Sequence, residues 1–127
     1  MYKLLIVDDN VNDRNGIRDF MDWNSFGVDE VFLAKNGEDG YKKALENDIS
    51  LVITDIAMPV MDGLDMASKI LEQKPDTKFI FMSCYDDTSY IRESMQHNAY
   101  GYLLKPIDID KLTAMLKKII EVKNNER

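Results

Sequence analysis

The chain has 127 residues, 45% of them hydrophobic and 31% charged, which suits one globular domain with its own apolar core. A formal net charge of −7 argues against a basic DNA- or RNA-binding face, and one cysteine with one histidine excludes an intramolecular disulfide and a Cys/His zinc cluster. No apolar run is long enough to span a membrane and the N-terminal run ends in two acids, so we expect no signal peptide and a cytoplasmic protein.

The first part of the chain alternates short apolar runs with helical patterns. A continuous apolar run is typical of a strand buried on both faces, and an apolar residue every three or four positions is typical of a helix. The predicted elements are a strand at 4–7, a helix at 11–23, a weaker strand at 28–34, a short helix at 38–47 and a buried strand at 51–54.

The same alternation continues to the C-terminus. After a loop marked by Met58-Pro59 and Asp62-Gly63, the pattern predicts a helix at 64–73, strands at 79–82 and 100–104, and helices at 87–96 and 109–122. Five strand–helix units in sequence indicate a parallel sheet with helices on both faces and right-handed crossovers.

Polar residues follow four of the predicted strands at the point where each ends. In an open α/β sheet the carboxyl ends of the strands form the edge where ligands bind, so residues distant in sequence meet there. These residues are Asp8 and Asp9 after the first strand, Asp55 after the third, Ser83 after the fourth and Lys105 after the fifth.

Together these side chains favour phosphoryl chemistry on an aspartate. Three close carboxylates repel one another, and Mg²⁺ relieves the repulsion while binding phosphate oxygens. A lysine and a hydroxyl can pair with a phosphoryl group, and one carboxylate, for which we take Asp55, can accept it as an acyl phosphate. Each residue alone is a common loop residue, and an Asp-Gly pair is more often a turn than a site, so the prediction depends on their common position.

These segments closely resemble the receiver domain of bacterial two-component response regulators over residues 3–122. The matching segments are Leu5-Ile6-Val7-Asp8-Asp9, the run from Ile53 to Gly63, Ser83, and Tyr102-Leu103-Leu104-Lys105-Pro106. The resemblance implies a flavodoxin-like (βα)5 three-layer sandwich, with a parallel five-stranded sheet of order 2-1-3-4-5. Residues 1–122 would form this receiver domain, and 123–127 would be a frayed helix end or the start of a linker.

The resemblance also implies a role for each acid. Asp55 matches the phosphorylated aspartate and supplies one Mg²⁺ ligand. Asp9 matches the acid that binds Mg²⁺ directly, and Asp8 the acid that acts through a water. The backbone carbonyl of Ala57 would be a further ligand.

Three residues match the part of the family that responds to the phosphoryl group. Ser83 matches the switch hydroxyl, Tyr102 the aromatic switch residue that turns inward, and Lys105 the lysine that pairs with the phosphoryl group. The Lys105–Pro106 bond would be cis, which a proline tolerates at low cost and which aims the lysine into the pocket.

Four positions depart from the usual pattern or vary within the family. Asn10 replaces an acid, which should spare Mg²⁺ binding, and Cys84 replaces a smaller residue beside the switch hydroxyl, where it would narrow access. Ala57 and Tyr85 occupy positions that affect how fast the phosphoryl group hydrolyses, so its lifetime here stays open.

The finer pattern is similar to regulators in which an AraC-type helix-turn-helix domain follows the receiver. The relevant segments are Asp22-Trp23, Phe26-Gly27, the run from Ser83 to Asp87, and the run from Leu104 to Asp108. The implied partners are a sensor histidine kinase and, on activation, a second copy bound through the surface of 87–96, 100–104 and 109–122. DNA would be bound by a helix-turn-helix domain that these residues do not contain. The receiver domain itself would bind neither nucleic acid nor a membrane.

Two alternatives stay open at this point. A Mg²⁺ phosphatase of a related fold also places carboxylates at strand ends, but such enzymes use a second acid two residues after the nucleophile, where Ala57 stands. A phosphorylation-independent interaction module could use the same fold, although every expected site residue is present.

Overall fold

A five-stranded parallel sheet forms the centre of the molecule. The computed structural model describes residues 2–84 and 99–126. Within them the strands lie in the order β2-β1-β3-β4-β5, as the resemblance implied. They are β1 (Tyr2–Val7), β2 (Val28–Ala34), β3 (Leu51–Asp55), β4 (Lys78–Ser83) and β5 (Ala99–Leu104).

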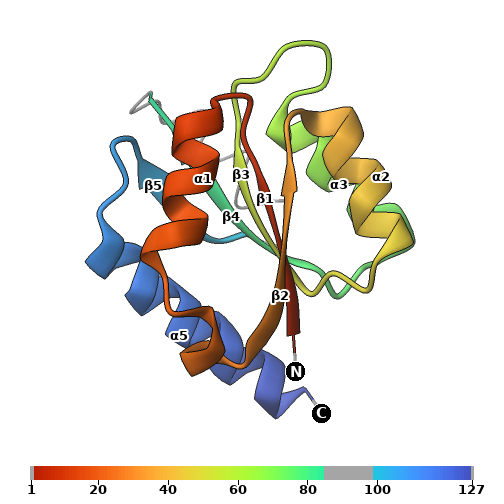
Figure 1. The fold of residues 1–127 in the computed structure, drawn as a ribbon. Helices are drawn as coiled ribbons and strands as arrows, with labels where there is room; N and C mark the ends of the chain where they lie inside the picture. Colours follow the sequence, from red (N-terminus) through yellow and green to blue (C-terminus); the bar gives the residue numbers. More distant parts are fainter. Residues whose placement is uncertain (1, 85–98, 127) are drawn as a thin grey trace.

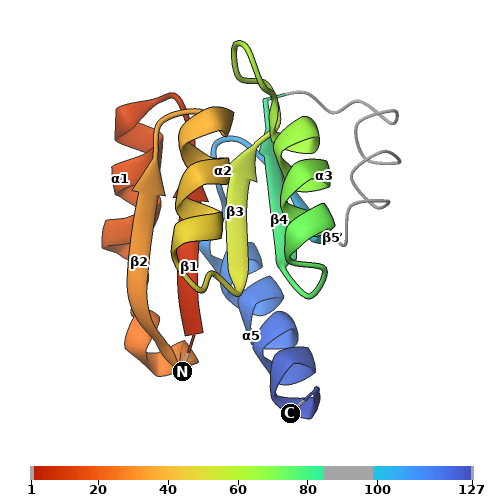
Figure 2. The ribbon, with the colours of Figure 1, turned by 90° about the vertical axis from the view of Figure 1, so that its right-hand side faces the viewer.

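Helices cover both faces of this sheet and make the three-layer sandwich. Figures 1 and 2 show α1 and α5 on one face and α2 and α3 on the other. The helix predicted at 87–96 lies outside the described residues. The described helices are α1 (Val11–Phe20), the 3₁₀ turn η1 (Trp23–Phe26), α2 (Gly37–Glu46), α3 (Gly63–Gln73) and α5 (Ile109–Asn125).

Two helix ends differ by three residues from the sequence-based prediction. The helix predicted to reach residue 23 ends at Phe20, because Met21 is extended and the chain turns through η1, where the indole of Trp23 donates to the carbonyl of Arg18 at 2.8 Å. The last helix continues beyond residue 122 to Asn125, and its end is held by a hydrogen bond of 2.5 Å from the Tyr2 hydroxyl to Asn124.

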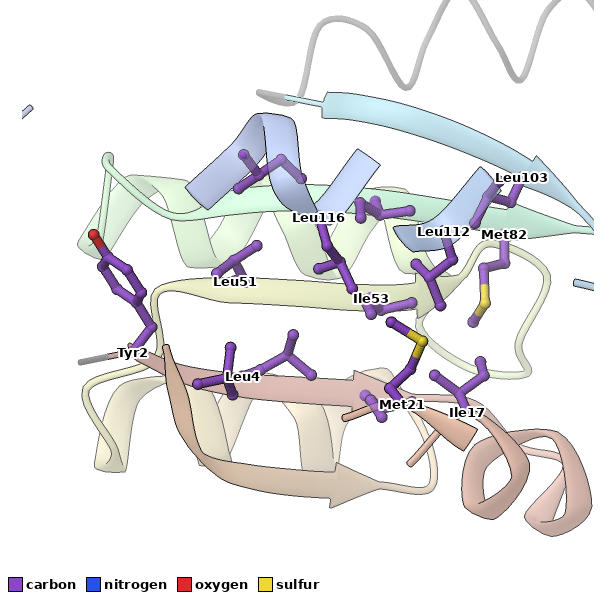
Figure 3. Close-up of a cluster of buried hydrophobic side chains, with 14 residues drawn as sticks. Tyr2, Leu4, Ile17, Met21, Leu51, Ile53, Met82, Leu103, Leu112 and Leu116 are labelled. Carbon is purple, nitrogen blue, oxygen red and sulfur yellow. The ribbon is translucent and has the colours of Figure 1, made fainter. Parts of the chain in front are cut away.

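Two apolar clusters follow from the alternation of side chains along the strands. One lies between the sheet and α1 with α5, and Figure 3 shows Leu112 and Leu116 beside Leu51 and Ile53. The other lies between the sheet and α2 with α3, and includes the stacked rings of Phe79 and Phe81. Burial on both faces explains why the central strands are continuous apolar runs in the sequence.

The strand register brings the predicted site residues to one edge. Val7 pairs with Thr54, so the residues that follow them, Asp8 and Asp55, are neighbours. Further along the sheet, the pairing of β4 with β5 places Ser83 opposite Leu104, directly before Lys105. The described helices include none that is both long enough and apolar enough to cross a membrane.

Candidate functional site

Three carboxylates gather at the carboxyl edge of β1 and β3. Asp8, Asp9 and Asp55 each offer an oxygen, and these oxygens lie within 4.8 Å of one another. Asp8 is fully buried and Asp55 is 6% exposed, whereas Asp9 is open to solvent. The structure therefore brings together the three acids that the sequence analysis selected.

The first turn of α1 holds the Asp8 end of the cluster in place. The backbone N–H of Asn10 donates to the carboxylate of Asp8 at 2.9 Å, and the guanidinium of Arg14 donates to the Asp8 carbonyl at 2.7 Å. The side chain of Asn10 in turn caps α1 by accepting from the N–H groups of Asn12 and Asp13. Asn10 thus keeps a structural role where the family more often has an acid.

Lys105 reaches into the acid cluster from the end of β5. Its ammonium lies 2.7 Å from Asp8 and 3.4 Å from Asp55, and the side chain is 11% exposed. It also lies 3.1 Å from Asp13, on the first turn of α1. The Lys105–Pro106 peptide bond is cis, and the Lys105 N–H donates to the carbonyl of Ser83 at 2.9 Å.

Burial shifts the ionisation of the two inner acids. The pKa of Asp55 is raised to about 6, chiefly by desolvation; the charges of Asp8 and Asp9 add to this rise, and Lys105 opposes it. Desolvation also raises the pKa of Asp8. For Lys105, burial alone would lower the pKa, but the hydrogen bond to Asp8 and the charge of Asp55 outweigh it and raise the pKa. The pocket therefore holds negative charge at a cost that a cation would relieve.

The donor set fits a hard divalent cation. Mg²⁺ prefers oxygen ligands and is held in proteins by one or two carboxylates together with water and phosphate oxygens. Asp8, Asp9 and Asp55 supply such oxygens at close range, and two of them are acids whose pKa burial raises. The exposed side of Asp9 leaves the cluster accessible from solvent.

The loop after β3 folds tightly against the phosphorylation candidate. The N–H of Gly63 donates to the carbonyl of Ile56 at 2.8 Å, and a Cβ at Gly63 would lie 2.2 Å from the carbonyl oxygen of Asp55. The side chain of Asp62 caps α3 by accepting from the N–H of Asp65 at 2.8 Å. The Asp62-Gly63 pair, which the sequence suggests only as a turn, thus helps to shape the site. Ala57 in this loop is exposed.

The two proposed switch residues lie on neighbouring strands. Ser83 is fully buried at the end of β4, and Tyr102 is half-buried on β5 and packs against the apolar cluster on the α2 and α3 face. Cys84, which follows Ser83, is exposed. Tyr85, whose position the family resemblance connects with phosphoryl lifetime, lies outside the described residues.

Asp13 and Arg14, on the first turn of α1, contact this region but are not among the residues predicted from the sequence. Neither residue directly follows a strand, and the predicted site residues are those that do. A usable signal exists, since the first turn of a helix that follows a strand lies beside the strand's carboxyl end.

Comparison with known proteins decides the family. The model of the response regulator receiver domain matches residues 4–117. The chain belongs to this family. Since the family is one of receiver domains and not a class of enzymes, the phosphatase alternative is set aside.

Named relatives of this receiver domain are transcriptional regulators. It is 34% identical over 120 residues to the "uncharacterized transcriptional regulatory protein YesN" of Bacillus subtilis, covering 94% of this chain and 33% of YesN. It is 32% identical to the transcriptional regulatory protein HptR of Staphylococcus aureus, covering 94% of this chain and 47% of HptR. The chain thus spans a third to about half of the length of these relatives.

Solved structures share the fold over nearly the whole chain. The receiver domain of AraT, a response regulator from Geobacillus stearothermophilus, has a TM-score of 0.92 at 35% identity and covers 98% of this chain and 97% of its own. A two-component transcriptional regulator AraC from Clostridium phytofermentans has a TM-score of 0.87 at 32% identity, covering 99% and 97%. The resemblance to AraC-type regulators and the flavodoxin-like fold are therefore both confirmed.

Proposed function

We propose that this receiver domain is a phosphoacceptor switch that takes a phosphoryl group from the phosphohistidine of a sensor histidine kinase onto Asp55. A carboxylate oxygen of Asp55 attacks phosphorus, a P–O bond forms, and the P–N bond to the kinase histidine breaks with the electron pair leaving on the imidazole. The observation that carries this proposal is the position of Asp55, buried between Asp8 and Lys105 at the end of β3.

The residues around Asp55 divide the electrostatic work. Mg²⁺, held by Asp9 and Asp55 directly, by Asp8 through a water and by the Ala57 carbonyl, would neutralise charge on the phosphoryl oxygens. Lys105 already lies 3.4 Å from Asp55 and would pair with the phosphoryl group as a point charge.

The output of the switch would pass through Ser83 and Tyr102. The hydroxyl of Ser83 would move to the phosphoryl group, and Tyr102 would pack inward into the space behind it. This would shift a two-state equilibrium at the surface formed by the helix predicted at 87–96, β5 and α5, and that surface would then bind a second copy. Since the named relatives are transcriptional regulators, the proposed output is transcription, through a DNA-binding domain and not through this one.

Acetyl phosphate with Mg²⁺, followed by intact mass, tests the acceptor. The wild type should gain one phosphoryl group, and Asp55→Asn should gain none because its side chain lacks the nucleophilic carboxylate. Asp65→Asn is the matched control, since it removes the same charge from the first turn of α3. Equal labelling of Asp55→Asn and the wild type, or no labelling of the wild type, would contradict the proposal.

A further inference from the structure

The Lys105 ammonium has a carboxylate partner that does not belong to the acid cluster. Its three N–H donors are directed to three carboxylates, at 2.7 Å from Asp8, 3.1 Å from Asp13 and 3.4 Å from Asp55. Asp8 and Asp55 are members of the group that could hold a metal ion, and Asp13 is not. The ion pair between Asp13 and Lys105 therefore does not involve an acid of the predicted metal site.

The position of Asp13 on α1 favours this ion pair with Lys105. Its N–H donates to the capping side chain of Asn10 at 3.1 Å, which fixes the first turn of α1, and an acid in that turn is favoured by the helix dipole. The side chain of Asp13 is 45% exposed, compared with 0% for Asp8 and 9% for Asp55. An ammonium that moves toward Asp13 therefore regains water and keeps a carboxylate partner.

Lys105 and a divalent cation compete for the same buried acids. Both are positive, and both are attracted to Asp8 and Asp55, where the low local dielectric strengthens attraction and repulsion alike. Without Asp13, the ammonium would have only these two acids as ion-pair partners among those it has in the described structure. A cation that binds Asp8 and Asp55 would then have to displace the ammonium from both acids, and the ammonium would lose its carboxylate partners.

We propose that Asp13 is a positioning residue that holds the Lys105 ammonium toward α1 and so leaves Asp8 and Asp55 available to Mg²⁺. This rests on the proposed function only in taking Mg²⁺ as the cation of the acid cluster. Asp13 would act through Lys105, and it is not one of the three acids that could hold the metal.

Mg²⁺ titration by isothermal calorimetry tests the proposal without any phosphoryl transfer. Asp13→Asn should weaken Mg²⁺ binding by about two- to fivefold, the range expected when a partly exposed ion pair is lost. Asp13→Glu should retain most of the affinity. Asp65→Asn is the matched control for charge, because it lies on the first turn of α3 and forms no ion pair among the described residues, and it should change the affinity much less.

A Lys105→Met background separates positioning from simple charge. This substitution should by itself strengthen Mg²⁺ binding, because the competing cation is gone. Adding Asp13→Asn should then have a smaller effect than in the wild type, because the lysine through which Asp13 acts is absent.

Two outcomes would overturn the inference. If the wild type binds Mg²⁺ but Asp13→Asn and Asp65→Asn weaken it equally, or if Asp13→Asn has the same effect with and without Lys105, Asp13 acts only as a distant charge. The Asp13→Glu and Asp13→Asn comparison decides the question even if Lys105→Met fails to fold. Absence of Mg²⁺ binding by the wild type would contradict the proposed function itself, which distinguishes that failure from this one.

Discussion

Asp55 is placed where its charge is costly, and this has a measurable consequence for stability. Burial raises its pKa from 3.8 to about 6 in the folded chain. As pH falls from about 7 to about 4, the folded state takes up a proton on Asp55 before the unfolded state does. The folded state binds more protons in this window, so this residue makes the metal-free protein more stable as pH falls.

The expected size follows from the pKa difference. At about pH 7 the ionised Asp55 should cost the metal-free protein roughly 2–3 kcal/mol, and below about pH 4 the cost should vanish. Urea unfolding in EDTA, compared between wild type and Asp55→Asn, isolates this contribution because the variant cannot titrate at this position. Asp55→Asn should be the more stable protein at neutral pH, and the two should converge in acid. A pH-independent difference would contradict the assigned shift.

At this scale the sequence predicts a residue well when its place depends only on the strands. Five site residues each follow an apolar run, and the order of the parallel strands alone brings them to one edge of the sheet. These residues are Asp8, Asp9, Asp55, Ser83 and Lys105. Asp13 depends instead on where the first turn of α1 directs its side chain, and on how far Lys105 reaches. The sequence places Asp13 near this edge, on the first turn after the first strand, but it does not give the distance between Asp13 and Lys105.

The loop between β3 and α3 depends on a glycine that approaches backbone. A Cβ at Gly63 would lie 2.2 Å from the carbonyl oxygen of Asp55 and 3.1 Å from the Cα of Ile56, and neither atom can move without shifting the strand end. Gly63→Ala should therefore lower the free energy of unfolding by about 1–3 kcal/mol or more, as overpacking does. Gly16→Ala is the matched control, since nothing lies within 4 Å of its Cβ position in α1. It should raise stability by about 0.5–1 kcal/mol, because alanine favours a helix interior. Equal effects of the two substitutions in urea unfolding would argue against the close approach.

The same loop contains a residue in a conformation that suits glycine better. Val60 has φ of 71°, in the left-handed region, and is fully exposed, so its side chain gains nothing from packing. The left-handed conformation costs a β-branched residue roughly 1–2 kcal/mol, and glycine avoids this cost. Glycine in turn destabilises the folded state by about 0.5–1 kcal/mol, because its backbone loses more conformational entropy on folding. Val60→Gly should therefore be more stable by up to about 1 kcal/mol. Val11→Gly removes the same side chain from the first turn of α1, where Val11 is half exposed and its φ is not positive, and it should be destabilising. A Val60→Gly protein no more stable than wild type in thermal or urea unfolding would contradict the strain.

Element boundaries show the limit of patterns in the sequence. The strands and the centres of the described helices lie where apolar periodicity predicts them, because burial alone sets that periodicity. The end of α1 lies three residues earlier than predicted, since Trp23 continues the apolar pattern although it belongs to η1. Its indole is held by the Arg18 carbonyl, a contact that periodicity cannot distinguish from helical packing.

For the whole molecule, the sheet separates the site from the place where α5 ends. The acid cluster lies at the carboxyl edge, whereas β1 begins and α5 ends at the opposite end of the molecule (Figure 1). Polar contacts fix that end: Tyr2 donates to Asn124, and the ammonium of Lys123 donates to the carbonyl of Asp76 at 2.6 Å. The last turns of α5, the helix that contacts β5, are therefore fixed to β1 and to the loop before β4.

The ion pair of Lys78 and Glu126 also lies at this end of α5, and substitution of Lys78 should have a different effect on stability from substitution of Glu126. The charged groups are 3.0 Å apart, with Lys78 8% exposed and Glu126 42% exposed, and the ammonium also lies 5.4 Å from the centre of the Tyr100 ring on β5. Burial opposes the charge of Lys78, and the hydrogen bond to Glu126 offsets this, so its pKa is raised. Glu126→Gln leaves a buried ammonium without its counter-charge and should cost about 1–3 kcal/mol, whereas Lys78→Met leaves only a carboxylate that water can solvate and should change stability by less than about 1 kcal/mol.

The Lys3–Glu30 pair provides the matched control for this inequality. Its charged groups are 3.9 Å apart and both are more exposed, at 37% and 55%, so Glu30→Gln should change the free energy of unfolding by less than about 0.5 kcal/mol. Urea unfolding of the three variants at neutral pH measures the order directly. If Glu126→Gln costs no more than Glu30→Gln, the end of α5 is not held by Lys78. If Glu126→Gln costs more than Glu30→Gln, the buried ammonium of Lys78 on β4 holds the end of α5. Because this ammonium also contacts the Tyr100 ring on β5, a shift of Tyr100 would then change the environment of the ion pair at the end of the helix.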